Sequence, residues 1–216
     1  KSRPIPLGII KADEALGLGI ILSILSVVLL GLASNLLASF LLASSILFYI
    51  FIYTIWLKRK TYYNIVIGGA AGALPPLIGW VSVTDHISSF PVILFLIIFI
   101  WTPPHFWALS LFSENDYDKA GLPMLPNVLG KSVTKRSILK YSYLLYLTSF
   151  LPYLLDFSGE LYLLIMLVLN TNFLYLAYSV NINDDKTSKK LFKFSIIYLF
   201  LIFITLIADN FINIFL

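Results

Sequence analysis

The stretch Leu94-Phe-Leu-Ile-Ile-Phe-Ile100 is apolar at every position, and Ile196-Ile-Tyr-Leu-Phe-Leu-Ile-Phe203 has the same character near the other end of the chain. A helix that is apolar on every face belongs in a bilayer or in the interior of a large protein. The strands of a membrane β-barrel would instead alternate apolar and polar residues over segments of about ten residues. The two stretches therefore predict helices that cross a membrane.

Further apolar runs surround these two. A run of about 20 apolar residues can span a bilayer, and the chain has seven candidates, at residues 16–34, 36–57, 64–80, 91–111, 141–157, 160–180 and 191–212. Hydrophobic residues make up 59% of the 216 residues and charged residues 12%, against about 25% charged in an average soluble domain. We therefore expect an all-α, multi-pass membrane helix bundle in which residues 1–216 form a single domain. The chain has no cysteine, which excludes disulfides and thiolate metal sites.

The basic residues alternate between loops. The 15 Lys and Arg residues lie in the segments 1–11, 58–60, 119–140 and 186–193, and the intervening loops contain none. Because cytoplasmic loops accumulate Lys and Arg, this alternation predicts that the N-terminus and the basic loops are cytoplasmic and that the C-terminus is outside. The net charge of +4 then follows from topology, and we expect no nucleic-acid partner.

Residues 112–140 form a polar island between two of the apolar runs. Three of its carboxylates, Glu114, Asp116 and Asp118, are spaced by two residues and lie close to several lysines. Such a group at a lipid boundary can hold a divalent metal and a phosphorylated ligand. On a helix, Glu114 and Asp118 would share a face and Asp116 would point almost oppositely, whereas an extended loop would let all three converge.

Several motifs, in order along the chain, indicate a family. They are Ser2-Arg-Pro-Ile-Pro6, the Gly-rich segment 67–79, Trp101-Thr-Pro-Pro-His105, Asp116-Tyr117 and Pro123-Met-Leu-Pro126. With these motifs nearly the whole chain resembles the protoheme IX farnesyltransferase family, the heme O synthases of the UbiA prenyltransferase superfamily. That family has nine helices. The resemblance therefore implies that seven of the nine are present here, and that two helices and a first Asp-rich motif precede Lys1.

The resemblance implies a membrane enzyme that uses Mg²⁺ to transfer a farnesyl group from farnesyl diphosphate to a vinyl group of heme b, giving heme O for terminal oxidases. Carboxylate-bound Mg²⁺, with Lys and Arg, would stabilise the leaving diphosphate. An aromatic cavity would shelter the carbocation-like fragment. The expected setting is a bacterial inner membrane, with the mitochondrial inner membrane as the alternative. A heme A synthase or an oxidase assembly factor is the expected protein partner.

The same resemblance assigns site residues. Asp116 and Tyr117 are expected to be catalytic, with Asp116 as a metal ligand and Asp118 and Glu114 as further candidate ligands. The residues expected to bind the diphosphate are Arg3, Lys58, Arg59, Asn64 and Lys119. For the three residues Arg3, Lys58 and Arg59, the alternative is that they serve only as topology signals. For Asn64, which opens a helix, the alternative is an N-cap or a position at the lipid edge.

His105 follows Pro103 and Pro104 near the expected cytoplasmic end of its helix. A polar ring at this depth is a candidate catalytic group, as a ligand of the heme iron or as a proton carrier during water addition. The alternative is a structural histidine that hydrogen-bonds to carbonyl groups freed by the prolines. The sequence leaves both roles open.

Two other classes of protein share parts of this pattern. Another UbiA-type prenyltransferase, acting on a quinone or chlorophyll precursor, would use the same metal chemistry but would lack the Trp101–His105 run. A seven-helix transporter or photoreceptor is the non-enzyme alternative. The last run, 191–212, has no mid-membrane Lys for a retinal Schiff base, and the interior helices lack paired ionisable groups for ion coupling.

Overall fold

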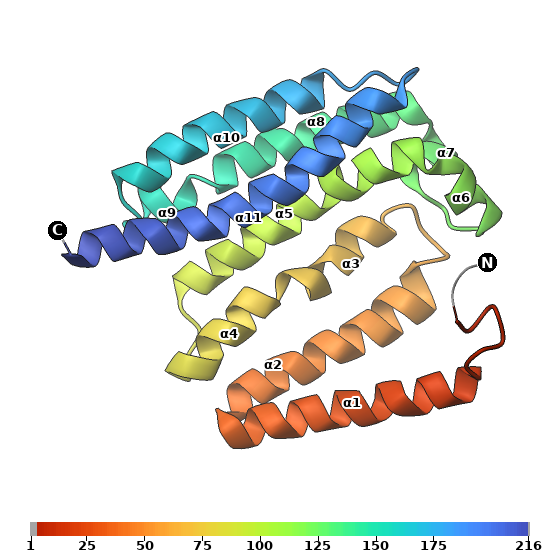
Figure 1. Cartoon of the computed structure of the whole chain (residues 1–216), viewed down its shortest axis with the longest axis horizontal. Coiled ribbons are helices and arrows are strands. Elements are labelled where there is room, and N and C mark those ends of the chain that lie inside the picture. Colours follow the sequence, from red (N-terminus) through yellow and green to blue (C-terminus); the bar gives the residue numbers. More distant parts are fainter. Residues whose placement is uncertain (1–3, 216) are drawn as a thin grey trace.

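The structure, a computed structural model, describes residues 4–215, with side chains described to residue 212. It is a bundle of long helices joined by short loops (Figure 1). The elements in chain order are α1 (Ala12–Ala33), α2 (Leu36–Leu47), the π-helix η1 (Phe48–Leu57), α3 (Asn64–Ala73), α4 (Pro75–Thr84), α5 (Ser89–Phe112), α6 (Glu114–Lys119), α7 (Leu125–Leu129), α8 (Lys131–Thr148), α9 (Leu151–Leu154), α10 (Glu160–Tyr178) and α11 (Asp185–Phe215).

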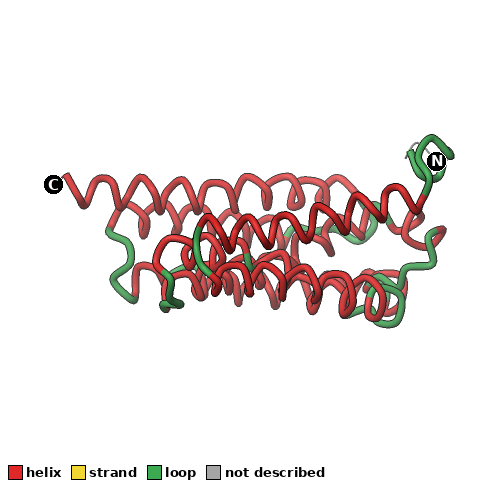
Figure 2. Tube along the Cα trace, turned by 90° about the horizontal axis from the view of Figure 1, so that it is seen from below, coloured by secondary structure: helices red, strands yellow, loops and turns green. Residues whose placement is uncertain are grey.

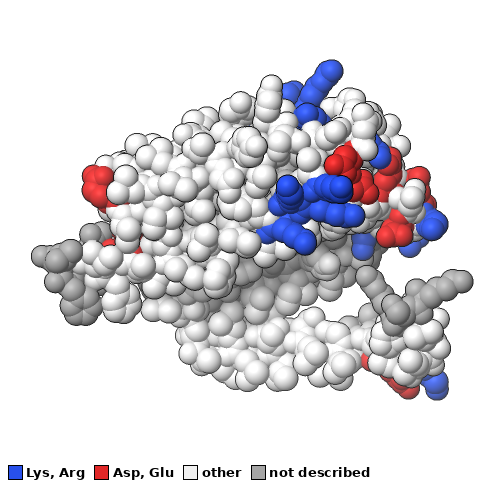
Figure 3. Space-filling view, turned by 45° about the horizontal axis from the view of Figure 1, so that its top comes forward, with Lys and Arg blue, Asp and Glu red and all other residues white. Residues whose placement is uncertain are grey.

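The long helices lie side by side, and the connecting loops gather mainly at the two ends of the bundle (Figures 1 and 2). Lys, Arg, Asp and Glu crowd one of these ends, and the middle of the visible surface is almost free of charge (Figure 3). We call this the charged end. It contains the loop that begins at Lys58, helices α6 and α7, and the starts of α8 and α11.

Six helical segments in residues 4–215 are long and apolar enough to cross a membrane. They are Ala12–Ala33, Leu36–Leu57, Asn64–Thr84, Ser89–Phe112, Glu160–Tyr178 and Asp185–Ile212. They confirm the prediction of an all-α membrane bundle and match six of the seven apolar runs.

The seventh run, 141–157, requires a correction of its bounds. The helix in this region, α8, begins at Lys131 and ends at Thr148, and the short helix α9 follows it with Pro152 in its first turn. The apolar run marks only the second half of α8, because the first half is basic. Helix α8 nonetheless packs against α5 and α10 and so belongs to the bundle.

Helix α5 is the centre of the bundle, since α3, α4, α8 and α11 all pack against it. Its buried residues include Ile97, Trp107 and Ala108. Pro103 and Pro104 lie inside α5 without ending it. Another proline pair, Pro75-Pro76, separates α3 from α4, because proline fits the first turn of a helix but not its interior.

Buried hydrogen bonds hold the C-terminal half together. The Tyr198 hydroxyl donates to Asn170 Oδ1 (2.7 Å), and Asn170 Nδ2 donates to Ser149 Oγ (2.8 Å). The Tyr162 hydroxyl donates to the Ser149 carbonyl oxygen (2.7 Å). Such bonds between membrane helices contribute about 0.6–2 kcal/mol each. They fix α10 and α11 against the segment that follows α8.

Asp209 makes a second connection between α10 and α11, at the end of the bundle opposite the charged end. Its side chain is buried, and its carboxylate accepts hydrogen bonds from the backbone N–H groups of Gly159 and Tyr162. Gly159 is the N-cap residue of α10, and no side-chain hydrogen bond of its own caps the helix. A residue of α11 therefore caps the start of α10.

We predict that Asp209→Ala destabilises the protein by about 1–2 kcal/mol, the usual value of a lost helix cap, because two buried N–H groups lose their acceptor. Asp209→Asn keeps one acceptor oxygen and should lose less. Thermal unfolding of the purified variants in detergent measures both effects. If the alanine variant unfolds at the wild-type temperature, Asp209 does not cap α10.

Candidate active site

A cavity of about 720 Å³ opens at the charged end. We call it the polar cavity. Its walls come from η1 and the loop after it, from α3, from the end of α5, and from α6 and the loop that follows. The lining residues are Tyr53, Lys58, Asn64, Ile65, Phe106, Ser113, Asp116, Tyr117, Ala120, Leu122 and Met124. Segments far apart in the sequence thus form one site.

The three candidate carboxylates lie on the short helix α6 and separate as a helix requires. Asp116 lines the polar cavity. Glu114 Oε2 instead forms an ion pair with Lys131 Nζ (2.9 Å), and Asp118 Oδ1 accepts a hydrogen bond from Asn127 Nδ2 (2.6 Å). The structure therefore does not bring Glu114 and Asp118 to the cavity as metal ligands. Their partners on the side of α7 and α8 occupy them, because residues four apart share one helix face.

Helix α6 ends in a glycine turn that helps to place Tyr117. Gly121 has a φ of +62°, and its N–H donates to the Asp118 carbonyl oxygen (2.9 Å). The N–H of Leu122 donates to the carbonyl oxygen of Tyr117 (3.1 Å). These two bonds form a Schellman cap, which favours glycine at the left-handed position. Leu122 and Tyr117 then lie together in the cavity wall.

Asn64 is the buried polar residue of the cavity, with 1% of its surface exposed. Its Nδ2 donates to the carbonyl oxygens of Lys58 (3.1 Å) and Pro123 (3.4 Å), which belong to two separate loops. Its Oδ1 is buried and has no hydrogen-bond partner. Asn64 is the first residue inside α3 and Tyr63 is the cap residue, so the N-cap alternative for Asn64 is wrong.

Lys58 and Tyr117 add a cation and a hydroxyl to the same cavity. The Lys58 ammonium lies 6.0 Å from the centre of the Tyr53 ring. Burial, and after it the neighbouring Asp116 carboxylate, raises the pKa of the Tyr117 hydroxyl above its ordinary value. The Tyr117 hydroxyl therefore keeps its proton at neutral pH and can donate a hydrogen bond.

Other predicted residues lie away from the cavity wall. Arg59 and Lys119 are exposed and do not line the cavity. Arg3 lies outside the described residues. The structure thus brings together Asp116, Tyr117, Lys58 and Asn64 of the predicted set.

His105 is buried on a different face of α5, against α11. Its ring stacks between Trp101 and Phe192, with ring centres 4.3 and 4.7 Å away. Its Nδ1 lies 2.7 Å from Ser195 Oγ. Ser195 Oγ also lies 2.6 Å from the Phe192 carbonyl oxygen, to which its hydroxyl can donate; this arrangement fits a His105 ring that is protonated at Nδ1 and donates to Ser195 Oγ. The carbonyl oxygen of Ser195 accepts a further bond from Trp101 Nε1 (2.8 Å).

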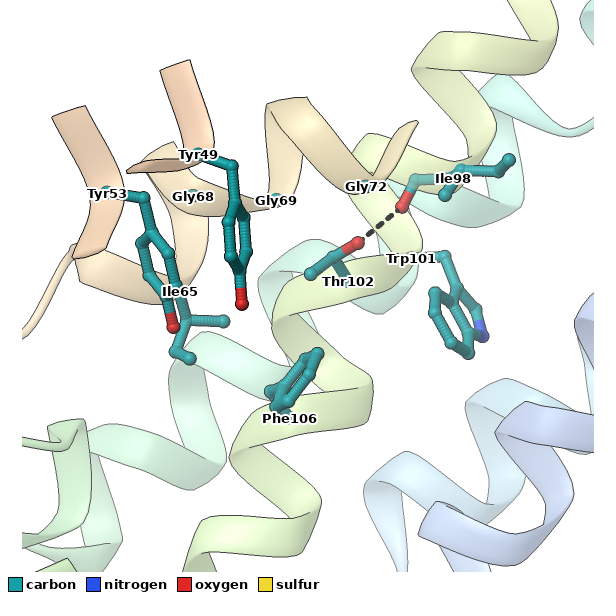
Figure 4. A pocket seen from close by; sticks show the side chains of 10 residues that line it. All are labelled: Tyr49, Tyr53, Ile65, Gly68, Gly69, Gly72, Ile98, Trp101, Thr102 and Phe106. Carbon is teal, nitrogen blue, oxygen red and sulfur yellow. Dashed lines mark hydrogen bonds between the residues drawn. The ribbon is translucent and has the colours of Figure 1, made fainter. Parts of the chain in front are cut away.

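A second cavity, of about 240 Å³, extends the site into the bundle (Figure 4). We call it the apolar cavity. Its lining residues are Tyr49, Tyr53, Ile65, Gly68, Gly69, Gly72, Ile98, Trp101, Thr102 and Phe106. Three of these, Tyr53, Ile65 and Phe106, also line the polar cavity, so the two cavities adjoin.

The glycines of α3 make room for this cavity. A Cβ added at Gly68 would overlap the ring of Tyr53, and one at Gly69 would lie 3.0 Å from the methyl carbon of Thr102. A Cβ at Gly72 would meet nothing within 4 Å. Tyr53 therefore packs directly on the backbone at Gly68, and Gly72 faces open space.

The sequence did not single out Tyr49, Tyr53, Phe106 or Ser113. The two tyrosines lie four residues apart on η1, and both side chains project toward the glycines of α3 (Figure 4). The sequence signal that could have indicated this cavity was two tyrosines four residues apart, followed by a glycine-rich helix.

Among the described residues, no three His, Cys, Asp or Glu side chains gather in a cluster that could hold a metal. Two residues that line the polar cavity nevertheless carry side-chain oxygens of the kind that Mg²⁺ prefers: the Asp116 carboxylate, and Asn64, whose Oδ1 is buried and has no hydrogen-bond partner. Mg²⁺ usually takes one or two protein oxygens and fills its other positions with water and substrate phosphate. These residues therefore fit Mg²⁺ bound together with a phosphorylated ligand.

Comparisons with known proteins place the whole chain in a family. Curated relatives named protoheme IX farnesyltransferase occur in Acidiphilium cryptum (52% identity, covering 96% of this chain and 69% of the relative), Neorickettsia sennetsu (51%, 96% and 68%) and Rickettsia massiliae (50%, 97% and 70%). A solved structure described as "Structural and mechanistic insights into the biosynthesis of Digeranylgeranylglyceryl phosphate synthase in membranes" is 25% identical. It covers 96% of this chain and 73% of its own, with a TM-score of 0.78. The model of the UbiA prenyltransferase family matches residues 1–205, and this chain belongs to that family.

Proposed function

We propose that this protein transfers a farnesyl group from farnesyl diphosphate to the vinyl group of heme b and so forms heme O. The observation that carries this function is the identity of about half of all residues, over nearly the whole chain, with relatives named protoheme IX farnesyltransferase. The two adjoining cavities support it, since the reaction needs a polar site for a diphosphate and an apolar site for an isoprenoid.

The polar cavity binds the diphosphate in this proposal. Asp116 and Asn64 Oδ1 would hold Mg²⁺, which neutralises the charge that develops on the diphosphate as its bond to carbon breaks. The Lys58 ammonium adds a positive charge, and the Tyr117 hydroxyl donates a hydrogen bond to a phosphate oxygen.

The apolar cavity receives the isoprenoid. Tyr49, Tyr53, Trp101 and Phe106 present aromatic surfaces there. Such surfaces stabilise a carbocation-like fragment through the negative face of the ring, and the apolar walls exclude water that would capture it. Tyr53 and Phe106 stand where the two cavities meet, which is where the reacting carbon would lie.

We assign His105 a positioning role. It stacks on Trp101, whose indole lines the apolar cavity, and the two side chains share Ser195 as a hydrogen-bond partner. Ligation of the heme iron or proton transfer by His105 would require the acceptor to reach the α5–α11 face, where Phe192 already covers the ring.

The charged end would face the cytoplasm of a bacterial inner membrane. The support is the confinement of Lys and Arg to alternate loops. A heme A synthase or an oxidase assembly factor that receives the product stays a prediction.

The alternative within the family is transfer to a quinone or chlorophyll precursor. To distinguish the acceptors, membranes containing the protein translated from its complete coding sequence are supplied with farnesyl diphosphate and heme b. Chromatography of the extracted pigments should then show heme O. A prenylated quinone in its place would contradict the heme assignment.

We predict that Asp116→Asn lowers heme O formation by at least about 100-fold, the usual effect of removing one group that stabilises transition-state charge. The substitution removes a charge at the cavity with little change of volume. Asp118→Asn is the matched control on the same helix, and it should cost only a few-fold. Equal losses of activity in the two variants would contradict a specific role of Asp116 in the cavity.

We predict that Asn64→Ala raises the Mg²⁺ concentration needed for half-maximal activity by about tenfold, because the metal loses an oxygen ligand. Titrating activity with Mg²⁺ in wild-type and variant membranes measures the change. If Asn64 only links the two loops, thermal stability falls and the Mg²⁺ dependence stays that of the wild type.

We predict that Gly68→Ala raises the KM for farnesyl diphosphate several-fold, because the new methyl group displaces the Tyr53 ring toward the junction of the two cavities. Gly72→Ala is the matched control, since it adds the same methyl group to the same cavity without a neighbour within 4 Å. Steady-state kinetics with both variants compares them. An unchanged KM for Gly68→Ala would contradict binding of the substrate at this junction.

A further inference from the structure

A groove of about 430 Å³ lies outside the candidate active site, between α8 and the end of α10. Its walls are one face of α8 and the segment that follows α10. The lining residues are Ser132, Lys135, Arg136, Leu139, Ser179, Val180, Asn181 and Ile182. None of these residues lines either cavity of the active site.

The charged residues of this groove are both cations. In the described part of the chain, neither Lys135 nor Arg136 forms an ion pair with a carboxylate, whereas the nearby Lys131 is paired with Glu114. The Lys135 ammonium lies 6.0 Å from the centre of the Tyr178 ring, a weak contact that leaves its charge available. The groove thus holds two positive charges without a neutralising partner.

Nearby polar groups add hydrogen-bond donors. Asn181 Oδ1 accepts from the backbone N–H of Asn183 (3.0 Å), so the amino group of the Asn181 side chain is the end left to donate. Ser132 lies in the first turn of α8, and none of the hydrogen bonds in the described part of the chain involves its hydroxyl. The Ser179 hydroxyl already donates to the Leu176 carbonyl oxygen (3.0 Å) and cannot donate again.

Carboxylates near the groove do not line it. Asp184 follows in the same loop and Asp185 is the first residue of α11; Asp184 Oδ1 accepts a hydrogen bond from the backbone N–H of Lys186 (3.0 Å). Neither residue is part of the groove wall. The charge that a ligand meets inside the groove is therefore positive.

Three apolar side chains complete the wall, and one of them, Leu139, lies toward the middle of the bundle. Leu139 lies one helical turn beyond Lys135, about 6 Å further along α8 and away from the charged end. Val180 and Ile182 face the same groove. A ligand with an anionic group at one end and a hydrocarbon chain at the other matches this order. A basic pocket between membrane helices at the level of the headgroups is a recurrent site for anionic lipids.

We propose that this groove binds the phosphate group of an anionic phospholipid from the leaflet at the charged end. Lys135 and Arg136 pair with the phosphate, Asn181 and Ser132 donate hydrogen bonds to it, and an acyl chain runs along Leu139. This site depends on the placement of the helices in a membrane and not on the reaction at the active site, so each can fail without the other.

The test uses the purified protein in detergent, titrated with phosphatidylglycerol or with phosphatidylcholine, and native mass spectrometry counts bound lipid. The wild type should prefer phosphatidylglycerol. In the double variant Lys135→Gln/Arg136→Gln, the preference for phosphatidylglycerol over phosphatidylcholine should be about tenfold smaller. Lys60→Gln/Lys190→Gln is the matched control, since it removes the same charge at two exposed sites outside the groove, and it should keep the wild-type preference.

Three results would overturn the proposal. The first is an equal loss in the control variant, which would show attraction by net charge alone. The second is displacement of the lipid by an equal concentration of inorganic phosphate, which would show a site for free anions. The third is a double variant that binds phosphatidylglycerol normally but no longer binds heme, followed by absorbance, which would show that the groove holds the propionates of the acceptor.

A conservative variant separates recognition from folding. Arg136→Lys keeps the charge and should keep most of the lipid preference. If Arg136→Lys loses as much preference as the double variant while both unfold at the wild-type temperature, charge pairing with the phosphate is contradicted.

Discussion

The buried side chain of Asn64 is the constraint on which the candidate site depends. One end of its amide donates to the carbonyl oxygens of Lys58 and Pro123 and so joins the loop after η1 to the loop after α6. Because both protons of the amino group point at these loops, the other end, Oδ1, is left buried without a partner. Such an unpaired group costs about 1–3 kcal/mol unless a ligand satisfies it. In the proposed function, the same side chain that joins the two loops therefore also supplies an oxygen to the cation.

The geometry of helix α6 sends its carboxylates in different directions. Helix α6 turns Glu114 toward Lys131 and Asp118 toward Asn127, and this leaves Asp116 for the cavity. Two acidic side chains are thereby occupied by structural partners, and the remaining one stands near Tyr117, whose raised pKa keeps it a donor. The polar cavity thus combines one carboxylate, on Asp116, with the Tyr117 hydroxyl and the Lys58 ammonium. In the proposed function the carboxylate serves the metal and the two donors serve the phosphate.

The sequence predicted more of the fold than of the site. Fully apolar runs such as residues 94–100 identified the membrane helices, because a bilayer demands them, but the apolar run at 141–157 missed the basic start of α8. For residues 114–118 the sequence left both a helix and an extended loop open; the structure has the helix, which separates Asp116 from Glu114 and Asp118. The sequence could not place the ring of Tyr53, which depends on contact with Gly68 across two helices, nor the burial of His105 against Ser195. Contacts between segments far apart in the chain leave no pattern in the neighbouring sequence from which they could be predicted.

In the proposed function, Asp116 and Asn64 together hold Mg²⁺ at the diphosphate. A cryo-electron microscopy map of the protein with Mg²⁺ and a non-reactive thio analogue of farnesyl diphosphate tests it most directly. We expect metal density within about 2.0–2.1 Å of an Asp116 oxygen and of Asn64 Oδ1, with the isoprenoid beside Tyr53. Metal and diphosphate bound by Glu114 and Asp118 instead, on the other face of α6, would contradict it.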